Sequence, residues 1–406
     1  MSYINKGVPG IDQYLTLNEP DVGAALPKVR AYVYCVHVGG KTEDHTQELY
    51  PQNAEVPLLF KPFTIRGVTF NNRIFVVGTK PLRRRFSDNG HATDWHLVHI
   101  GLIMSRVSRL AEWVGSAWRL PPSFQKVASL HRTHHIAPLK RVVTFVQAHG
   151  VKIGIQLSHA GRKASTGAPW LRFNSDRTAK TAKYIADSDE GGWLDEGMRG
   201  LLPREADALT GSGQFSPPPK AISEEQLQAV VEAFSKAAQR CKAAGFDYIE
   251  IHAAHGYLLH QFISPLSNTR TDQYGGSLEN RLRFPLQVIE RVRAMWDKPL
   301  FVRISATEWA EGPEQDPTTG EWKQWGIEQS KVYVGELKKL GVDLIDCSSG
   351  GNWVKQKITS VPGYQVRICY RNDPDLLVGA VGMITEPEQA ESYLREGKAD
   401  IVSLAR

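Results

Sequence analysis

The segment from Gly245 to Phe284 constrains the fold more than any other part of the chain. Its first residues alternate, so that Tyr248, Glu250 and His252 share one face of an extended segment and isoleucines occupy the other. The alternation stops at His252, where a polar loop begins, and a helix is predicted from about residue 279. A buried strand that ends in polar residues before a long loop and a helix is typical of a β/α barrel, which carries its chemistry at the carboxyl ends of its strands.

Three side chains at the end of this strand could act on a substrate. His252 and His255 lie three residues apart, so both can point into one site, and Tyr257 follows two residues later. Two other interpretations of the histidine pair stay open, because histidines can simply pack or can bind a metal ion. No Asp or Glu lies within three residues on the loop side, which counts against a metal site.

The longer run HAAHGYLLHQFISPLSNTRTDQYGGSLENRLRF, residues 252–284, resembles the old yellow enzyme family of FMN-dependent ene-reductases. The His-Ala-Ala-His version is similar to the thermophilic-like subgroup and to fungal NADPH dehydrogenases. The resemblance extends over residues 57–72, 88–99 and 136–406. It implies a TIM (β/α)8 barrel that holds FMN, is reduced by NADPH, and acts on small-molecule enones or enals.

Composition limits the class of protein. A chain of 406 residues with 41% hydrophobic and 23% charged residues is ordinary for a soluble globular protein with one large barrel. The net charge of +6 comes from scattered residues, which argues against a nucleic-acid surface. We expect no signal peptide, the sequence has no apolar run near 18 residues, and the four widely spaced cysteines form no disulfide or metal pattern. We therefore expect a cytoplasmic protein without a membrane span; a homo-oligomer is compatible with the sequence.

Two domains are predicted. Residues 1–56 are rich in Pro, Gly and polar residues and are expected to form an irregular N-terminal extension. Residues 57–406 are expected to form the FMN-binding barrel. Within them, residues 57–72 alternate around Gly67 as a hairpin does, and in the resembling family this hairpin plugs the bottom of the barrel. Residues 73–78 are the predicted first barrel strand.

Three segments depart from the family pattern. Residues 79–87 carry three consecutive arginines where the family has a run that touches the flavin. Such a run would be an odd lining for a flavin ring, and a solvated loop is the favoured interpretation. Residues 101–135 contain no run of five β-forming residues, and the apolar spacing over 103–118 predicts an amphipathic helix, so the second β/α unit is expected to be disrupted. Residues 364–377 do not match the family's helix at that place.

Two polar residues lie inside otherwise apolar predicted strands. Gln156 faces inward near the end of the strand over 151–159, and its planar amide suits the donor and acceptor edge of a flavin pyrimidine. Arg303 interrupts the strand over 299–305. Both match flavin-contacting residues of the family, where the Arg stabilises the negative charge of reduced flavin. A Gln held by backbone and an Arg paired with a core carboxylate are the alternatives.

The last two predicted strands, over 379–384 and 400–406, resemble the family's FMN-phosphate site. Gly382 would let backbone N–H groups approach an anion, Arg406 could bind two phosphate oxygens, and Ala405 would contribute backbone. The family has a further helix beyond the position of Arg406. We therefore expect the last strand to remain uncovered, which would leave the barrel marginally stable and prone to lose FMN.

The resemblance assigns roles to the three residues first singled out. His252 and His255 would bind the substrate carbonyl oxygen, and Tyr257 would protonate the α-carbon. One alternative is a degenerate, non-catalytic homologue that binds flavin poorly, suggested by the three departing segments. Another is a flavin-independent phosphate-binding isomerase or aldolase, which ranks last because no Lys at a strand end is placed for a Schiff base.

Overall fold

The protein is described by a computed structural model. The residues that the structure describes are 56–77, 92–94, 96–100, 112–115, 133–163, 221–353, 355–366 and 376–404. The expected N-terminal extension therefore lies outside the described residues, apart from Val56, and so do residues 79–87.

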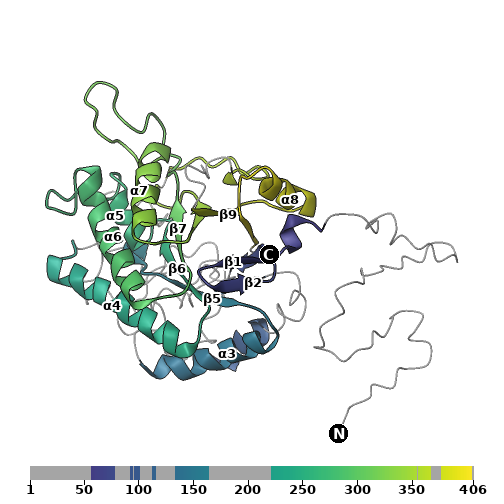
Figure 1. Ribbon diagram of the computed structural model, residues 1–406. Helices are drawn as coiled ribbons and strands as arrows, with labels where there is room; N and C mark the ends of the chain where they lie inside the picture. Colours follow the sequence, from purple (N-terminus) through teal and green to yellow (C-terminus); the bar gives the residue numbers. More distant parts are fainter. Residues whose placement is uncertain are drawn as a thin grey trace, which may run out of the picture. The chain divides into compact units, whose positions relative to one another are not determined.

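Eight parallel strands form a closed barrel, which confirms the predicted TIM (β/α)8 fold (Figure 1). The strands follow one another around the barrel in the order β10-β3-β4-β5-β6-β7-β8-β9. Their bounds are β3 (Ile74–Val77), β4 (Glu112–Gly115), β5 (Ile153–Leu157), β6 (Tyr248–Ala253), β7 (Leu300–Ser305), β8 (Leu344–Ser348), β9 (Leu377–Val381) and β10 (Ile401–Leu404).

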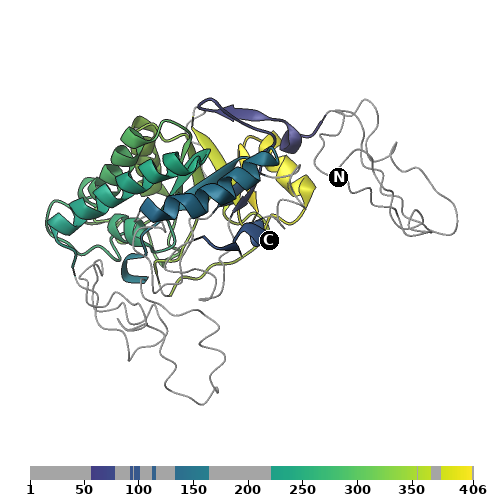
Figure 2. The ribbon, with the colours of Figure 1, turned by 90° about the horizontal axis from the view of Figure 1, so that it is seen from below.

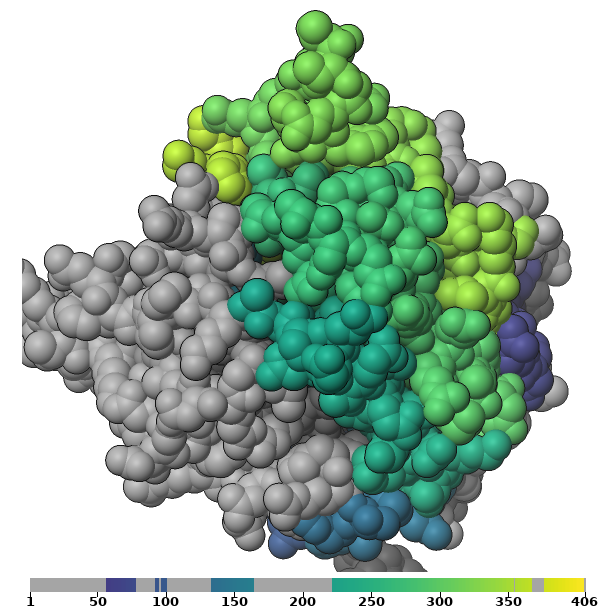
Figure 3. All heavy atoms as spheres, turned by 90° about the vertical axis from the view of Figure 1, so that its left-hand side faces the viewer, coloured from purple at the N-terminus to yellow at the C-terminus, as the bar shows by residue number. Residues whose placement is uncertain are grey.

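Helices cover the outside of the barrel, and Figure 2 shows them packed along it. The described helices are α3 (Ile136–Ala148), α4 (Glu224–Ala244), α5 (Leu258–Ile263), α6 (Leu278–Met295), α7 (Ile327–Lys339) and α8 (Pro387–Arg395), with short 3-10 turns η2 (Leu58–Phe60), η6 (Thr133–His135) and η7 (Gly161–Lys163). Figure 3 shows the outer surface where α4 lies beside α6. A capping box is present at the start of α4, where the Ser223 side chain accepts from the Gln226 backbone and the Gln226 side chain accepts from the Ser223 backbone.

The alternation of β6 separates two environments. Ile249 and Ile251 point outward and belong to the large apolar cluster between the sheet and the helices, together with Phe234 of α4 and Val288 of α6. Tyr248, on the other face, packs inside the barrel. Such a strand is buried on both sides, so its polar residues must find partners within the protein.

The second β/α unit differs from the sequence prediction, because it contains a barrel strand. Glu112–Gly115 forms β4, which pairs in parallel with β3 on one side and with β5 on the other. The predicted helix over 103–118 is therefore wrong at these residues, and the barrel has a second strand. The strand is only four residues long, so its β-forming residues were too few to outweigh the helical spacing around them. Two neighbouring strands supply the pairing that sequence alone does not show.

A hairpin of β1 (Phe63–Ile65) and β2 (Val68–Phe70) lies across one end of the barrel (Figures 1 and 2). Phe70 packs against Phe75 and Tyr248, with ring centroids 5.3 and 5.7 Å apart, and is fully buried. Burial of such a side chain stabilises the fold by about 1.5–3 kcal/mol. The hairpin therefore closes the amino-terminal end of the barrel, as predicted.

The last strand also differs from the sequence prediction, because its outer face is covered. β10 pairs with β3 as well as with β9, so the barrel closes. Ile401 is 2% exposed and belongs to the interior cluster, whereas Val402 is fully buried against Leu59 and Leu394 on the outside. The expectation that the apolar residues of this strand stay exposed is wrong, because η2 and α8 cover its outer face.

Two further features were addressed from sequence. Cys347 takes part in a disulfide bond, contrary to the expectation that the cysteines form none, while Cys241 is a buried free thiol. Within the described residues, no helix combines the length and the apolar character needed to cross a membrane.

Candidate active site

The barrel interior is built in layers, because inward-facing residues recur at every second position of a strand. Tyr248, Phe301 and Leu344 form the apolar layer next to the hairpin. Two positions further along the same strands lie Glu250, Arg303 and Asp346, and two positions further again lie His252, Ser305 and Ser348. Polarity thus increases from the closed end of the barrel toward the carboxyl ends of the strands.

The predicted catalytic residues come together at the carboxyl end of β6. The Nε2 atom of His252 lies 3.4 Å from the Nδ1 atom of His255, and the rings of His252 and Tyr257 lie 5.0 Å apart. One oxygen atom could contact both histidine nitrogens at hydrogen-bond distance. His255 Nε2 also lies 2.6 Å from the Ser348 hydroxyl, which orients the ring. The three residues therefore form one site.

A second group of polar side chains lies directly below the histidines. Gln156 donates from Nε2 to Glu250 Oε1, and the Nε atom of Arg303 lies 3.3 Å from Asp346 Oδ2. Glu250 and Asp346 are 1% and 2% exposed. Arg303 therefore does pair with a core carboxylate, as the alternative interpretation held, and this pairing is compatible with a flavin contact as well. Gln156 is held by a carboxyl group rather than by backbone.

These buried carboxyl groups perturb one another. Burial, together with the nearby Asp346, raises the pKa of Glu250 to about 8, although Arg303 opposes the shift. Burial also raises the pKa of Asp346, again opposed by Arg303. Two carboxylates this close cannot both ionise cheaply beside a single guanidinium. The pair therefore holds a proton at neutral pH, and the three side chains together are close to neutral.

At the other edge of the site, β9 ends at a glycine whose conformation the local structure requires. Gly382 has φ +109°, and a Cβ there would lie 2.6 Å from Gln365 Nε2 and 3.0 Å from Tyr364. Only glycine therefore suits this position, both because of its backbone conformation and because Gln365 and Tyr364 leave no room for a side chain. Ala405 and Arg406, the other predicted phosphate contacts, lie outside the described residues, as does most of 364–377.

Comparison with known proteins decides the family. The profile of the NADH:flavin oxidoreductase / NADH oxidase family matches residues 58–406. The chain belongs to this family. It is 41% identical over 360 residues to an NADH:flavin oxidoreductase of Gibberella zeae, which covers 86% of this chain and 82% of that one. It is 37% identical over 359 residues to an NADPH dehydrogenase of Geobacillus sp., covering 86% and 90%.

The solved structures agree with the fold. The old yellow enzyme homologue from Zymomonas mobilis has a TM-score of 0.58 and 20% identity, over 86% of this chain and 89% of that one. The protein is thus an FMN-family oxidoreductase, and the predicted resemblance to old yellow enzymes is confirmed. Membership in this family overturns the alternative of a flavin-independent isomerase or aldolase.

The described residues of this oxidoreductase fit FMN. Arg303 Nε is buried and makes an ion pair but no hydrogen bond among the described atoms, so it retains donor capacity. The amide of Gln156 lies on β5 and the guanidinium of Arg303 on β7, on either side of β6. Gly382 leaves its backbone free of a side chain. Among the described residues, no cluster of three or more His, Cys, Asp or Glu is placed to hold a metal ion.

Several residues of the site were missed from sequence. Glu250 and Asp346 lie beside the predicted cofactor contacts Gln156 and Arg303 on neighbouring strands. Ser348 contacts His255, and Lys163 donates to the His255 carbonyl at 2.7 Å. Glu250 shares the inward face with His252 in the alternating strand, so the pattern could have revealed it. Lys163 lies in η7 and reaches its partner across loops, which no local pattern indicates.

Proposed function

We propose that this oxidoreductase uses NADPH and FMN to reduce the activated C=C bond of α,β-unsaturated carbonyl compounds. The observation that carries the proposal is the convergence of His252 Nε2 and His255 Nδ1, 3.4 Å apart, above Gln156 and Arg303 and beside Tyr257. A pair of donors for one oxygen and a neighbouring phenol is the set of groups that conjugate reduction of an enone needs.

The two histidines bind the carbonyl end of the substrate. Each presents a ring nitrogen to the same point, so an oxygen placed there lies within hydrogen-bond reach of both rings. Negative charge develops on that oxygen as the C=C bond is reduced, and the donors stabilise it more strongly in the transition state than in the substrate. Ser348, in contact with the other nitrogen of His255, keeps that ring in place.

Tyr257 supplies the proton. Its side chain is 7% exposed, its ring contacts His252, and the Lys163 ammonium lies 5.5 Å from its ring centroid. The phenol O–H gives its proton to the α-carbon and regains one from water. Bound FMN supplies the hydride that is added at the β-carbon, taking it from NADPH.

The deeper residues hold the cofactor. Gln156 would bind the pyrimidine edge of FMN, and Arg303 would place a positive charge beside it. Glu250 and Asp346, on the neighbouring strands, fix these two side chains from the side, which leaves them little freedom to turn away from the cofactor. Gly382 would bring backbone N–H groups to the phosphate.

The test is turnover under anaerobic conditions. Purified protein is mixed with NADPH and 2-cyclohexen-1-one, and cyclohexanone is quantified by gas chromatography. We expect one cyclohexanone per NADPH consumed. NADPH oxidation that occurs only in air, with no saturated ketone, contradicts ene-reduction and leaves an oxidase. A colourless protein without the flavin absorbance near 450 nm would instead support the degenerate, non-catalytic alternative.

A further inference from the structure

The turn that follows β6 is held in a conformation that its sequence does not favour. His255 has φ +57° and Gly256 has φ +66°, so two consecutive residues lie in the left-handed region. A non-glycine residue there is disfavoured and persists only when the surroundings fix it. Because this turn connects His252 with Tyr257, its conformation sets where His255 and Tyr257 point.

Two hydrogen bonds, from β7 and η7, and a packing contact from the loop after β8 fix the turn. The His255 N–H donates to Ser305 Oγ at 2.9 Å, and Lys163 Nζ donates to the His255 carbonyl at 2.7 Å. A side chain on Gly351 would strike the backbone of His255, so the loop after β8 packs directly against the turn. The remaining contacts come from α5, which begins immediately after it.

The Gly256 N–H donates to the Nδ1 atom of His260 at 2.9 Å. His260 is the third residue of α5, the position from which a side chain can reach back to the backbone before a helix. It is fully buried, and burial together with Lys163 and Arg162 lowers its pKa to about 3. His260 is therefore neutral, and since Nδ1 accepts a hydrogen bond, its proton lies on Nε2.

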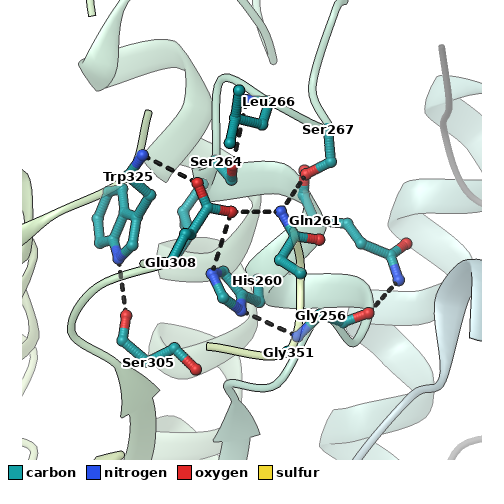
Figure 4. Close-up of polar contacts among 12 residues, drawn as sticks. Gly256, His260, Gln261, Ser264, Leu266, Ser267, Ser305, Glu308, Trp325 and Gly351 are labelled. Carbon is teal, nitrogen blue, oxygen red and sulfur yellow. Dashed lines mark hydrogen bonds and ion pairs between the residues drawn. The ribbon is translucent and has the colours of Figure 1, made fainter. Parts of the chain in front are cut away.

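The Nε2 atom of His260 faces the buried carboxyl group of Glu308, with Oε1 at 3.7 Å (Figure 4). Glu308 is fixed in turn, because it accepts from the Trp325 backbone N–H at 2.9 Å and from the Asn352 side chain. It lies in the loop after β7, and Asn352 lies in the loop after β8. A carboxyl oxygen is thus held opposite the Nε2–H of His260 by groups outside α5, at a distance longer than a hydrogen bond, and its action on that proton is electrostatic.

We propose that His260 and Glu308 are positioning residues for the catalytic turn: Glu308 keeps the proton of His260 on Nε2, so that Nδ1 can hold the Gly256 N–H and aim His255 and Tyr257. Neither residue touches the substrate in this account. The proposal rests on the proposed function only for its activity readouts, because the hydrogen bond itself can be measured without turnover.

Position 260 allows a matched comparison. His260→Leu removes the acceptor, whereas His260→Asn places an amide oxygen near the position of Nδ1 and keeps it. Phe262→Leu is the control, because Phe262 lies on the same short helix, is fully buried, and packs on Phe284 of α6 without an acceptor side chain. Loss of one buried hydrogen bond corresponds to about a tenfold effect.

The first readout is hydrogen–deuterium exchange of the peptide that contains the Gly256 amide, measured on the full chain. We expect about tenfold faster exchange in His260→Leu and wild-type exchange in His260→Asn and Phe262→Leu. The second readout is the dissociation constant of 4-hydroxybenzaldehyde, a phenol probe, followed by flavin absorbance. We expect it to rise about tenfold in His260→Leu only, with flavin reduction by NADPH much less affected.

Glu308→Gln tests the other half of the pair with almost no change of volume. A carboxylate accepts from all the N–H donors that surround it, whereas an amide must turn its own NH2 toward one of them. We expect this change to give an intermediate increase in exchange and in the probe's dissociation constant. If His260→Leu does not fold, Glu308→Gln and His260→Asn still separate the outcomes.

Two results overturn the proposal. One is unchanged Gly256 exchange in both His260→Leu and Glu308→Gln. The other is His260→Asn behaving like His260→Leu, which would mean that the ring and not the acceptor matters. A wild-type protein that binds no phenol contradicts the proposed function instead, and the exchange comparison then decides the role of His260 alone.

Discussion

The barrel has two unlike halves. In β5 to β8 the strands are five or six residues long, and their inner faces carry the four hydrogen-bonded or ion-paired side chains Gln156, Glu250, Arg303 and Asp346. In β3 and β10 the strands are four residues long and contribute Phe75, Val77 and Ile401 to an apolar interior cluster.

The difference shows how the barrel divides its tasks. The β5–β8 half buries polar groups at a cost, which is acceptable only because every one of them has a partner. The β9–β4 half, which runs through β10 and β3, closes the barrel by apolar packing. Changes in the first half should therefore affect chemistry and electrostatics, and comparable changes in the second half should affect only packing.

Tyr257→Phe should have the largest effect, and this effect should be limited to the rate of the step that reduces the enone. The change removes one proton donor and little volume, and general acid catalysis is typically worth 10²–10⁴-fold in rate. We expect the oxidation of reduced enzyme by an enone to slow by about that factor, while flavin reduction by NADPH changes little. Stopped-flow absorbance separates the two steps. Equal slowing of both would remove Tyr257 from the role of acid.

Arg303→Met should be the most destabilising change in the polar half. It leaves Asp346 and Glu250 buried without their cation, and breaking a buried ion pair costs about 3–5 kcal/mol. Urea unfolding of the FMN-free protein measures the free energy of unfolding without the cofactor contribution. A loss below about 1 kcal/mol would show that the carboxyl pair does not depend on Arg303.

Glu250→Gln should change the pH dependence of stability. The pKa of Glu250 is raised from 4.5 to about 8 in the folded protein, so the folded state keeps a proton that the unfolded state loses. The stabilisation is fully present below pH 4.5 and is lost as the pH rises toward 8. For one proton the slope is at most about 1.4 kcal/mol per pH unit.

Unfolding midpoints at pH 5.5, 6.5 and 7.5 test this slope. We expect wild-type stability to fall with rising pH, and Glu250→Gln to retain only the slope that Asp346 supplies. Parallel curves for the two proteins would mean that Glu250 is ionised in the folded state.

Ile401→Val should have the smallest effect and serves as the matched change in the apolar half. Ile401 is buried in the interior cluster, and loss of one buried methylene costs about 0.5–1.5 kcal/mol. Stability should be lower by that amount at every pH, and the rate of enone reduction should stay within twofold. A pH-dependent loss would show that the two halves are electrostatically coupled.

The sequence predicted the polar half far better than the other. Alternation in β6 and the isolated polar residues in β5 and β7 located His252, Gln156 and Arg303, because a buried polar residue in an apolar run has few explanations. The partners of these residues were not predicted. Glu250 meets Gln156 and Asp346 meets Arg303 only through the register of neighbouring strands, which the spacing within one strand does not reveal.

The sequence prediction of the apolar half failed for a different reason. β4 is four residues long and lies within a segment whose spacing favours a helix, so tertiary pairing with β3 and β5 overrides the local pattern. The cover of β10 comes from η2, which lies at the opposite end of the described barrel sequence. The His260–Glu308 contact likewise joins α5 to the loop after β7, which α6 and β7 separate along the chain, and only the closed barrel brings them together.

The central claim is that His252 and His255 converge over an FMN held by the polar half. Titration of the purified protein with 4-hydroxybenzaldehyde tests it most directly, because a phenolate bound to both histidines and stacked on the flavin gives a long-wavelength charge-transfer absorbance. We expect flavin at about one per chain and a saturable long-wavelength absorbance band, with binding of the phenol weakened in His252→Ala by about 1.5–3 kcal/mol. A flavin-loaded protein that gives no band, or an equal band in His252→Ala, would contradict it.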